Sequence, residues 1–222
     1  MDALWLSFRL AASVAVLLLL VSVPLAYWIA RTNWRGKFLI ESVVALPLVL
    51  PPTVLGFYLL VIMGADSPLG RIWLASFGHT LAFTFTGLLL ASLLYSLPFS
   101  VQPLVSAFEA VDPRLLDAAA VLGAGRWRTF QEVSLPLAVP GLITALVLSF
   151  AHTLGEFGVV LMVGGNIPGV TRTASIAIYD RVQSLEYSDA NRMSVALLLI
   201  SFAVLATLFA LNRRVWSAWP AR

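Results

Sequence analysis

The 222-residue sequence contains no cysteine and a single lysine, and only 11% of its residues are charged. Without cysteine the chain forms no disulfide and offers no thiolate to a metal or a substrate. Soluble domains carry charge on about a quarter of their residues, so this composition excludes an ordinary water-soluble domain. The lysine, Lys37, is followed by Phe38, and the Gly-Lys-Ser/Thr end of a Walker A loop is therefore missing. We do not expect the chain to hydrolyse ATP by that route.

Most of the chain is apolar. They make up 60% of the chain, and the mean hydropathy is +0.93. Five stretches free of Asp, Glu, Lys and Arg cover residues 10–30, 42–65, 72–108, 133–155 and 193–212. About 20 apolar residues are needed for a helix to cross the hydrocarbon core. We predict an all-α, multi-pass membrane protein in which residues 1–222 form one domain with five transmembrane helices, approximately 8–30, 40–63, 79–100, 137–163 and 193–212.

The basic residues indicate how the chain is oriented. One set of alternate loops holds nine of them, namely Arg31, Arg35, Lys37, Arg114, Arg126, Arg128, Arg213, Arg214 and Arg222. The other set holds five, namely Arg9, Arg71, Arg172, Arg181 and Arg192. The positive-inside rule places the larger set in the cytoplasm, with the N-terminus outside and the C-terminus inside. The basic residues lie at the ends of the spans, so the pI near 9.7 reflects membrane orientation rather than nucleic-acid binding.

The predicted cytoplasmic loop, residues 109–135, has the signals of a helix-turn-helix. Asp112 is a suitable N-cap and Pro113 suits the first helical position. A helix over 115–122 would end at Gly123 and Gly125. A second short helix over 126–133 would be ended by Pro136. The segment is either an ordinary connector or a docking surface whose small residues let a partner approach closely.

Three prolines open the second predicted span, at positions 47, 51 and 52. A proline inside a helix removes a backbone donor and clashes with the preceding turn. Two interpretations stay open: a helix that starts after Pro52, or a functional kink that is buried in protein or lines a cavity.

Polar side chains inside the spans are few. Hydroxyls recur at multiples of four in the third span, at Thr80, Thr84, Ser92, Ser96 and Ser100. They serve either close helix packing or a route for an anionic solute. Glu156 is the one charged residue between Glu132 and Arg172, and Thr153 lies three residues before it. A carboxylate inside a membrane span is a candidate functional group. His152, one turn earlier, is placed to pair with it, as a structural hydrogen bond or as part of a gate; two ligands do not complete a metal site.

Several phrases together resemble a known family. Asp117-Ala118-Ala119, Gly123, Val133 and Leu135-Pro136 follow the spacing of the "EAA" loop of ABC importer permeases, with Asp in place of Glu and Val in place of Ile. The phrases LPLVLPP, LGAGRWR, LGEFG and NIPG-TRT, spread over residues 46–173, resemble bacterial molybdate permease subunits. The resemblance implies an ABC type I importer permease fold in the bacterial inner membrane.

The same resemblance implies roles and partners. Residues expected to couple to an ATPase are Asp117, Ala118, Ala119, Gly123, Gly125, Arg126, Leu135 and Pro136. The hydroxyls and the intramembrane carboxylate themselves, rather than the resemblance, give the candidates for the pathway or gate, namely Thr84, Ser92, Ser96, Thr153 and Glu156. The implied partners are a second copy of the chain, two ABC ATPase subunits and a periplasmic molybdate-binding protein. The chain itself is expected to bind no cofactor or metal, while the partner ATPase uses ATP and Mg.

Two alternatives remain open. Related permeases carry tungstate or sulfate/thiosulfate, and the region 166–173 favours molybdate among them. A secondary transporter is the other class, but internal repeats and charged coupling residues would be expected inside its spans. Dependence of transport on ATP rather than on a proton gradient separates the two classes.

Overall fold

The structure, a computed structural model, describes residues 2–217, and within that range its regular secondary structure is entirely helical. The side chains of residue 208 and of residues 211–217 are not described. The helices in chain order are α1 (Asp2–Arg31), α2 (Lys37–Val49), α3 (Pro52–Met63), α4 (Pro68–Phe77), α5 (Phe85–Glu109), α6 (Pro113–Val121), α7 (Arg126–Thr129), the π-helix η1 (Phe130–Ser134), α8 (Leu135–Leu137), α9 (Val139–Leu154), α10 (Gly158–Gly164), α11 (Ala174–Gln183) and α12 (Tyr187–Ser217). The prediction of an all-α membrane protein is confirmed.

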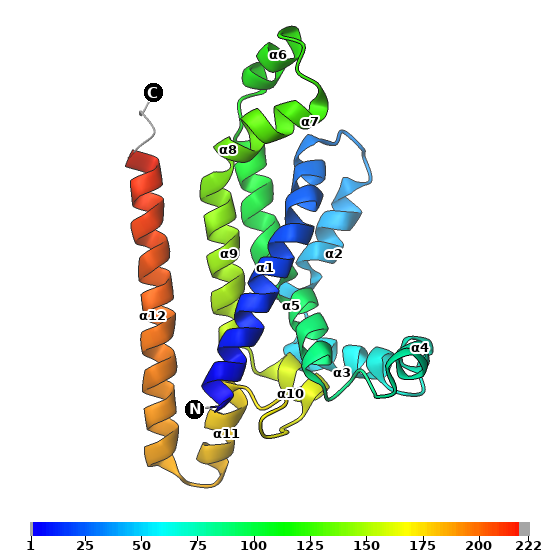
Figure 1. The fold of residues 1–222 in the computed structure, drawn as a ribbon, viewed down its shortest axis with the longest axis vertical. Helices are drawn as coiled ribbons and strands as arrows, with labels where there is room; N and C mark the ends of the chain where they lie inside the picture. The colour runs from blue at the N-terminus through cyan, green and yellow to red at the C-terminus, as the bar shows by residue number, and fades with distance from the viewer. Residues whose placement is uncertain (1, 218–222) are drawn as a thin grey trace.

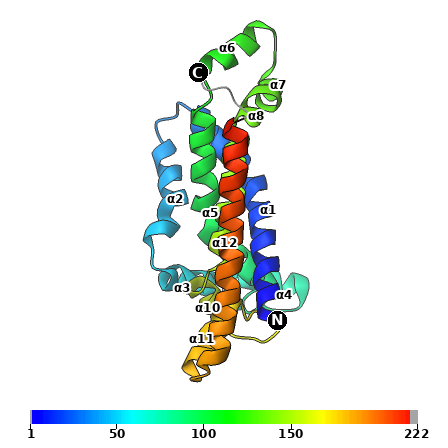
Figure 2. The same cartoon turned by 90° about the vertical axis from the view of Figure 1, so that its left-hand side faces the viewer.

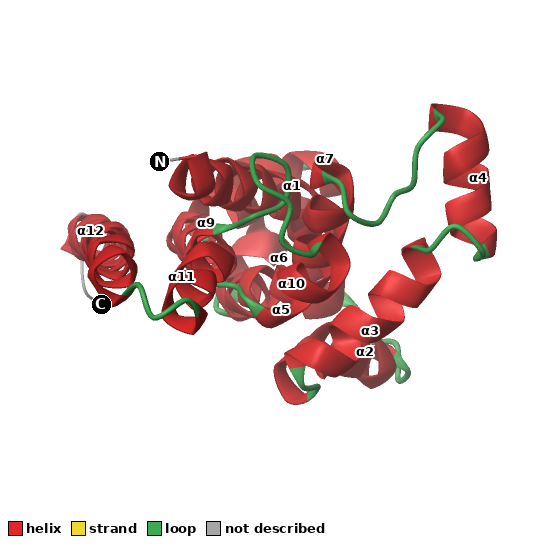
Figure 3. Ribbon diagram, turned by 90° about the horizontal axis from the view of Figure 1, so that it is seen from below, coloured by secondary structure: helices red, strands yellow, loops and turns green. Residues whose placement is uncertain are grey.

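Three long helices, α1, α5 and α9, pack against one another and run along the long axis of the molecule (Figure 1). The last helix, α12, stands beside them and contacts α9 and α11 (Figure 2). Helices α3 and α4 lie across the bundle near one end, and α4 projects away from it on the side opposite α12 (Figure 3). The segment containing α6 and α7 extends beyond the other end.

The packing of α1 follows from the spacing of its small and apolar residues. Its buried positions recur every three or four residues and form one stripe: Leu6, Ser7, Leu10, Ala11, Val14, Ala15, Leu18, Ser22, Ala26 and Ile29. Side chains at this spacing share one helix face. The close approach of α5 to α9 depends on Gly141, where an added Cβ would lie 2.3 Å from Ala107 Cβ. Small residues at such crossings let membrane helices pack tightly.

The predicted span 40–63 is not one helix. Helices α2 and α3 are bent by 111° at Leu50 and Pro51, so α3 turns across the bundle. Pro51 is the N-cap of α3 and Pro52 its first residue, positions at which a missing N–H costs no helical hydrogen bond. A helix does begin at Pro52, as one of the two interpretations expected, but residues 37–49 form a helix of their own despite Pro47, and the chain bends sharply between the two.

The predicted span 137–163 is also wrong in its extent. Its helix, α9, ends at Leu154, and α10 begins separately at Gly158. At its other end α9 is bent by 68° from the segment Arg126–Leu137. The third span begins later than predicted, since α5 covers Phe85–Glu109 rather than 79–100. Among the described residues, three helices are long and apolar enough to cross a membrane, and the number of crossings rises to as many as five if each bent pair is counted as one span.

The loops divide between two ends of the bundle as the charge count assumed. The loop 32–36 and helices α6 and α7 lie at one end, while α11 and the loop 165–173 lie at the other (Figure 1). The predicted basic residue Arg222 and the side chains of Arg213 and Arg214 lie outside the described part of the chain. The direction in which the bundle faces stays a prediction.

Candidate functional site

Helix α6 is largely exposed at its end of the bundle. Asp112 caps it by accepting a hydrogen bond from Arg114 N at 2.8 Å, and Pro113 occupies its first position, as predicted. None of its residues is buried. Its last turn presents Val121 and Leu122, which are 88% and 87% exposed. Because the segment extends past the apolar bundle, this apolar tip is available to a protein partner.

The turn after α6 is closed by backbone hydrogen bonds. Gly123 N donates to Ala120 O at 3.0 Å, and Ala124 N donates to Ala119 O at 2.9 Å, the pairing of a Schellman motif. Gly123 has φ +80°, a conformation that glycine adopts without a steric cost. A Cβ at Gly123 or Gly125 would meet no atom of the chain within 4 Å, so both positions open onto space that a partner can enter.

The second half of the loop differs from the predicted short helix. The helix from Arg126 does not end at Pro136; it passes through a π-helical turn over Phe130–Ser134 and continues to Leu137. Leu135 N reaches back to Phe130 O, which opens the helix by one residue before the proline. Such π-turns recur at functional sites. The bend comes instead at Ala138, the N-cap residue directly before α9.

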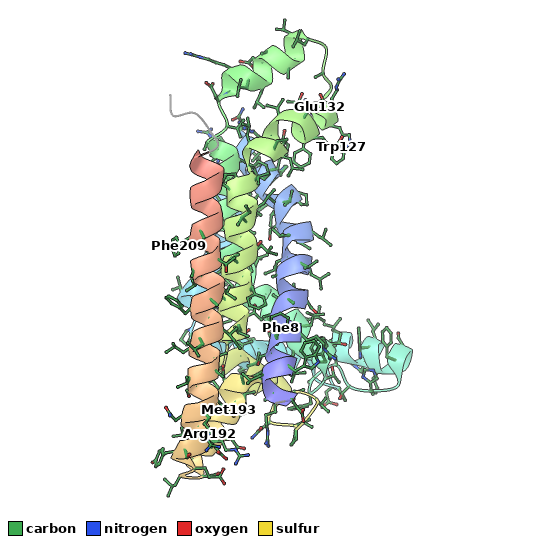
Figure 4. All side chains as sticks on the ribbon, turned by 60° about the vertical axis from the view of Figure 1, so that its left-hand side comes forward. Phe8, Trp127, Glu132, Arg192, Met193 and Phe209 are labelled. Atoms are coloured by element: carbon green, nitrogen blue, oxygen red, sulfur yellow. The ribbon has the colours of Figure 1, made fainter. Side chains whose placement is uncertain are left out.

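An aromatic cluster joins this second half to the bundle. Phe130 packs edge-on against Tyr27 of α1, with ring centres 4.8 Å apart, and stacks on Trp127 at 5.4 Å. Tyr27 also contacts Phe108 of α5 at 5.3 Å. Trp127 and Glu132 mark the outer side of this segment in Figure 4. The cluster therefore links the exposed loop to two membrane-spanning helices at once.

Arg31 strengthens the same junction. Its guanidinium donates to Phe108 O at 2.8 Å and reaches Val111 O at 3.5 Å. These carbonyls belong to the last turn of α5 and the residues that follow it, where carbonyls lack partners within the helix and attract cations. The end of α1 thus holds the end of α5 four residues before α6 begins.

The predicted coupling residues are all at this end, but they face different surroundings. Asp117, Ala118, Gly123, Gly125 and Arg126 are exposed. Leu135 instead packs against the core cluster around Phe108 and Ala138. Sequence reasoning did not single out Val121, Leu122 or the aromatic cluster; two apolar side chains directly before the glycine turn were the available signal.

A cavity of about 490 Å³ lies where α3, α5, α9 and α10 meet. It is lined by Pro52, Thr53, Tyr95, His152, Gly155, Glu156, Phe157 and Gly158. Helix α3 is held against α10 at this place by glycines: a Cβ on Gly158 would lie 2.7 Å from Pro52 Cβ, and one on Gly56 would lie 2.7 Å from Met162 Cβ.

Glu156 does not pair with His152, so that expectation is wrong. His152 Nδ1 lies 2.9 Å from Ser96 Oγ, and its ring stacks on Phe99 with centres 3.9 Å apart. Glu156 falls in the break between α9 and α10, which turns it off the face that His152 occupies. Its side chain is 4% exposed, and neither carboxyl oxygen has a hydrogen-bond partner in the described chain.

The other predicted pathway residues divide between packing and capping. Ser96 Oγ also lies 2.9 Å from Thr153 Oγ1, a buried contact that ties α5 to α9. Ser92 is fully buried and lies near the Glu156 carboxyl without completing a hydrogen bond. Thr84 precedes α5 and caps it, accepting from Gly87 N at 3.1 Å and donating to Leu81 O at 2.7 Å. Of the predicted pathway residues, Glu156 lines the cavity and Ser92 lies near its carboxyl, while Ser96 and Thr153 form the α5–α9 contact beside the cavity.

The loop 165–173 is partly ordered against the bundle rather than simply solvated. Thr171 is buried and donates to Gly164 O at 2.7 Å. Ala174 N, at the start of α11, donates to Ser7 Oγ of α1 at 2.8 Å. The predicted helix over 174–182 is confirmed as α11.

The described chain is a bundle of membrane-crossing helices that carries an exposed helix-turn-helix at one end. The chain belongs to the family of binding-protein-dependent transport system inner membrane components, whose model matches residues 22–217. It is thus a multi-pass inner-membrane permease, and the predicted permease class is confirmed.

Individual relatives narrow the class. The chain is 54% identical to the molybdenum transport system permease protein ModB of Azotobacter vinelandii, over 95% of this chain and 93% of that one. It is 41% identical to the protein of the same name from Escherichia coli K12, over 96% of each chain. The fold is similar to that of a bacterial alginate ABC transporter solved with its alginate-bound periplasmic protein, with a TM-score of 0.75 at 17% identity, over 96% of this chain and 78% of that one.

Proposed function

We propose that this chain is the membrane-spanning permease subunit of an ATP-driven molybdate importer. The choice of molybdate rests on the relatives, which are named molybdenum transport permeases and align over almost the whole chain. The observation that carries the mechanism is α6, an exposed helix with an apolar tip beyond the membrane-spanning bundle.

The proposed partner at α6 is an ABC ATPase, which binds ATP and Mg in place of this chain. Two copies of the permease would each present one α6 to one of two ATPase subunits. The exposed side chains of Val121 and Leu122 supply apolar contact, and the open space at Gly123 and Gly125 admits the partner surface. Buried apolar contact with small residues at the point of approach is what a protein interface core requires.

Motion of the ATPase would reach the bundle through the loop's two anchors. Phe130 contacts Tyr27 of α1, and Arg31 of α1 holds the end of α5 at Phe108. A displacement of α6 and α7 is therefore passed to α1 and α5 together. Because packed cores move as units rather than deform continuously, the expected response is a rocking of these helices between inward-open and outward-open states.

The proposed orientation puts α6 and the C-terminus in the cytoplasm, and α4, α11 and the N-terminus on the periplasmic side. The larger set of basic residues supports it. A periplasmic molybdate-binding protein would then dock at the α4 and α11 end and deliver the anion. Thr84, Ser92, Ser96, Thr153 and Glu156 are the proposed polar groups along or beside its route.

Reconstitution tests the proposal. The permease, its ATPase and the cognate binding protein are placed in proteoliposomes, and ATP hydrolysis is followed as oxyanions are added. We expect molybdate to stimulate hydrolysis, with tungstate close behind and sulfate weak. Stimulation by sulfate and not by molybdate would assign the chain to sulfate transport, and uptake driven by a proton gradient without ATP would refute the ATPase partnership.

A further inference from the structure

The cavity beside Glu156 combines two features that point to a ligand. The first is the carboxyl itself, which is 4% exposed, lines the cavity and has no hydrogen-bond partner in the described chain. A buried polar group without a partner costs free energy and calls for an explanation such as a missing ligand. The second is the N-terminus of α3, a 12-residue helix whose first two residues, Pro52 and Thr53, form one wall.

The charge of the ligand follows from what surrounds the carboxyl. The described residues that line the cavity include no Arg or Lys. A buried carboxylate without a cationic partner takes up a proton rather than remain charged. The other polar side chains of the lining are the Thr53 and Tyr95 hydroxyls and the His152 ring. At the start of α3, Pro51 and Pro52 have no N–H, and Val54 N and Leu55 N already donate to Pro51 O, which leaves Thr53 N as the backbone donor at the end of the helix whose dipole favours negative charge.

We propose that this cavity is a binding site for the transported oxyanion, held by hydrogen bonds from a protonated Glu156 and from the hydroxyls of Thr53 and Tyr95. The proposal rests on the proposed import function and identifies one place on its route. Glu156 keeps its proton throughout, so no proton is transferred with the anion. Neutral donors hold an anion less tightly than a fixed cation does, which suits a site that must release what it binds.

The cavity lies where two helices are interrupted, as is typical of substrate sites in transporters. It lies at the 111° bend between α2 and α3 and at the break between α9 and α10. Irregular backbone at membrane depth is tolerated where it lines a cavity, and broken helices of this kind form substrate sites in transporters. Pro52 of the bend and Gly158 after the break pack closely at the cavity wall, since a Cβ on Gly158 would lie 2.7 Å from Pro52 Cβ, so the two irregular segments are in direct contact.

Glu156→Gln separates a neutral donor from a charged carboxylate. The amide keeps a donor of nearly the same shape but cannot carry a negative charge. In complete transporter complexes in proteoliposomes, we expect uptake of radioactive molybdate by Glu156→Gln to stay within about twofold of the original chain. Glu156→Ala should lower uptake roughly tenfold or more, since a charged ligand loses a hydrogen bond.

A pH series gives a second measure. Tyr95 of α5 and His152 of α9 are the other titratable groups that line the cavity, and α3 and α10 contribute none among the described residues. Raising the pH should reduce uptake by the original chain once Glu156 loses its proton, while uptake by Glu156→Gln should stay level. The matched control is Glu41→Gln, an exposed carboxyl on α2 beside Lys37, which should retain the pH profile of the original chain.

Several results would overturn the site. Equal loss in the Gln and Ala variants would show that a charged carboxylate is needed, as for a cation site. Uptake at the original level in Glu156→Ala would place the cavity off the route. If the Ala variant fails to assemble by size-exclusion chromatography, Thr53→Val decides: it removes one hydroxyl at constant shape, should lower uptake severalfold, and refutes the site if uptake is unchanged. If sulfate proves to be the substrate, molybdate import fails as the proposed function, and the same comparisons made with sulfate still test the cavity.

Discussion

Replacing Gly123 with leucine tests the exposed turn as an ATPase contact. Gly123 has φ +80°, and a residue with a side chain loses about 1–2 kcal/mol in the left-handed region. A penalty of that size changes the population of the native turn by roughly 5- to 30-fold. The new side chain would also occupy the space in which the chain has no atom within 4 Å. Both effects oppose docking, so ATPase affinity should fall at least tenfold.

Gly125→Leu is the matched control because it separates the two effects. Gly125 has φ −69° and ψ 162°, which any residue adopts, and it too faces open space. Leucine there adds bulk to the same surface without backbone strain. If bulk at the partner surface is what matters, Gly125→Leu should also weaken the ATPase; if the turn conformation matters, only Gly123→Leu should.

The assay is titration of the ATPase against the permease in lipid nanodiscs, with thermal unfolding of the permease as a check on folding. We expect both variants to insert and unfold near the original temperature, since α6 buries no residue in the bundle. Gly123→Asn, which tolerates the left-handed region and is shorter, should bind better than Gly123→Leu. Wild-type ATPase affinity in Gly123→Leu would refute the docking of an ATPase at this turn.

Three further outcomes are expected. Arg31→Gln should lower the free energy of unfolding by about 1–3 kcal/mol, because Phe108 O loses a charged donor at 2.8 Å, whereas Arg35→Gln, at an exposed position, should have little effect in a thermal or denaturant series. Gly158→Ala should destabilise the α3–α10 contact by about 1–3 kcal/mol, since its Cβ would lie 2.7 Å from Pro52 Cβ. Gly155→Ala should be tolerated, because the nearest atom to its Cβ would be 3.8 Å away. Equal stability of the two variants in the same assay would contradict this packing. Single cysteines replacing Asp66 and Gln131, both exposed, should react with an impermeant thiol reagent in intact spheroplasts at Asp66 and be protected at Gln131, and the reverse pattern would invert the proposed orientation.

Features that depend on neighbours in the chain were predictable from the amino acids. Asp112 and Pro113 begin α6, and Gly123 ends it, because capping and positive φ are decided within a few residues. The membrane-crossing helices were found because a charge-free run of sufficient length has few alternatives in a lipid bilayer. The loop was also identifiable from the sequence, because Asp117, Gly123 and Leu135-Pro136 lie within one short stretch and their spacing can be read directly.

Features that depend on contacts between distant segments needed the folded chain. Pro51 and Pro52 start α3, but the 111° angle between α2 and α3, with α3 packed on α10 at Gly56 and Gly158, is visible only in the folded chain. His152 was expected to meet Glu156 four residues on, but Ser96 of another helix binds it instead. The meeting of Tyr27, Phe108 and Phe130 is likewise set by three segments about 80 and 20 residues apart, a proximity that no local pattern encodes. Glu156 is the sharpest case: its sequence marks it as a buried acid, but only the arrangement of four helices shows that it faces a cavity without a partner.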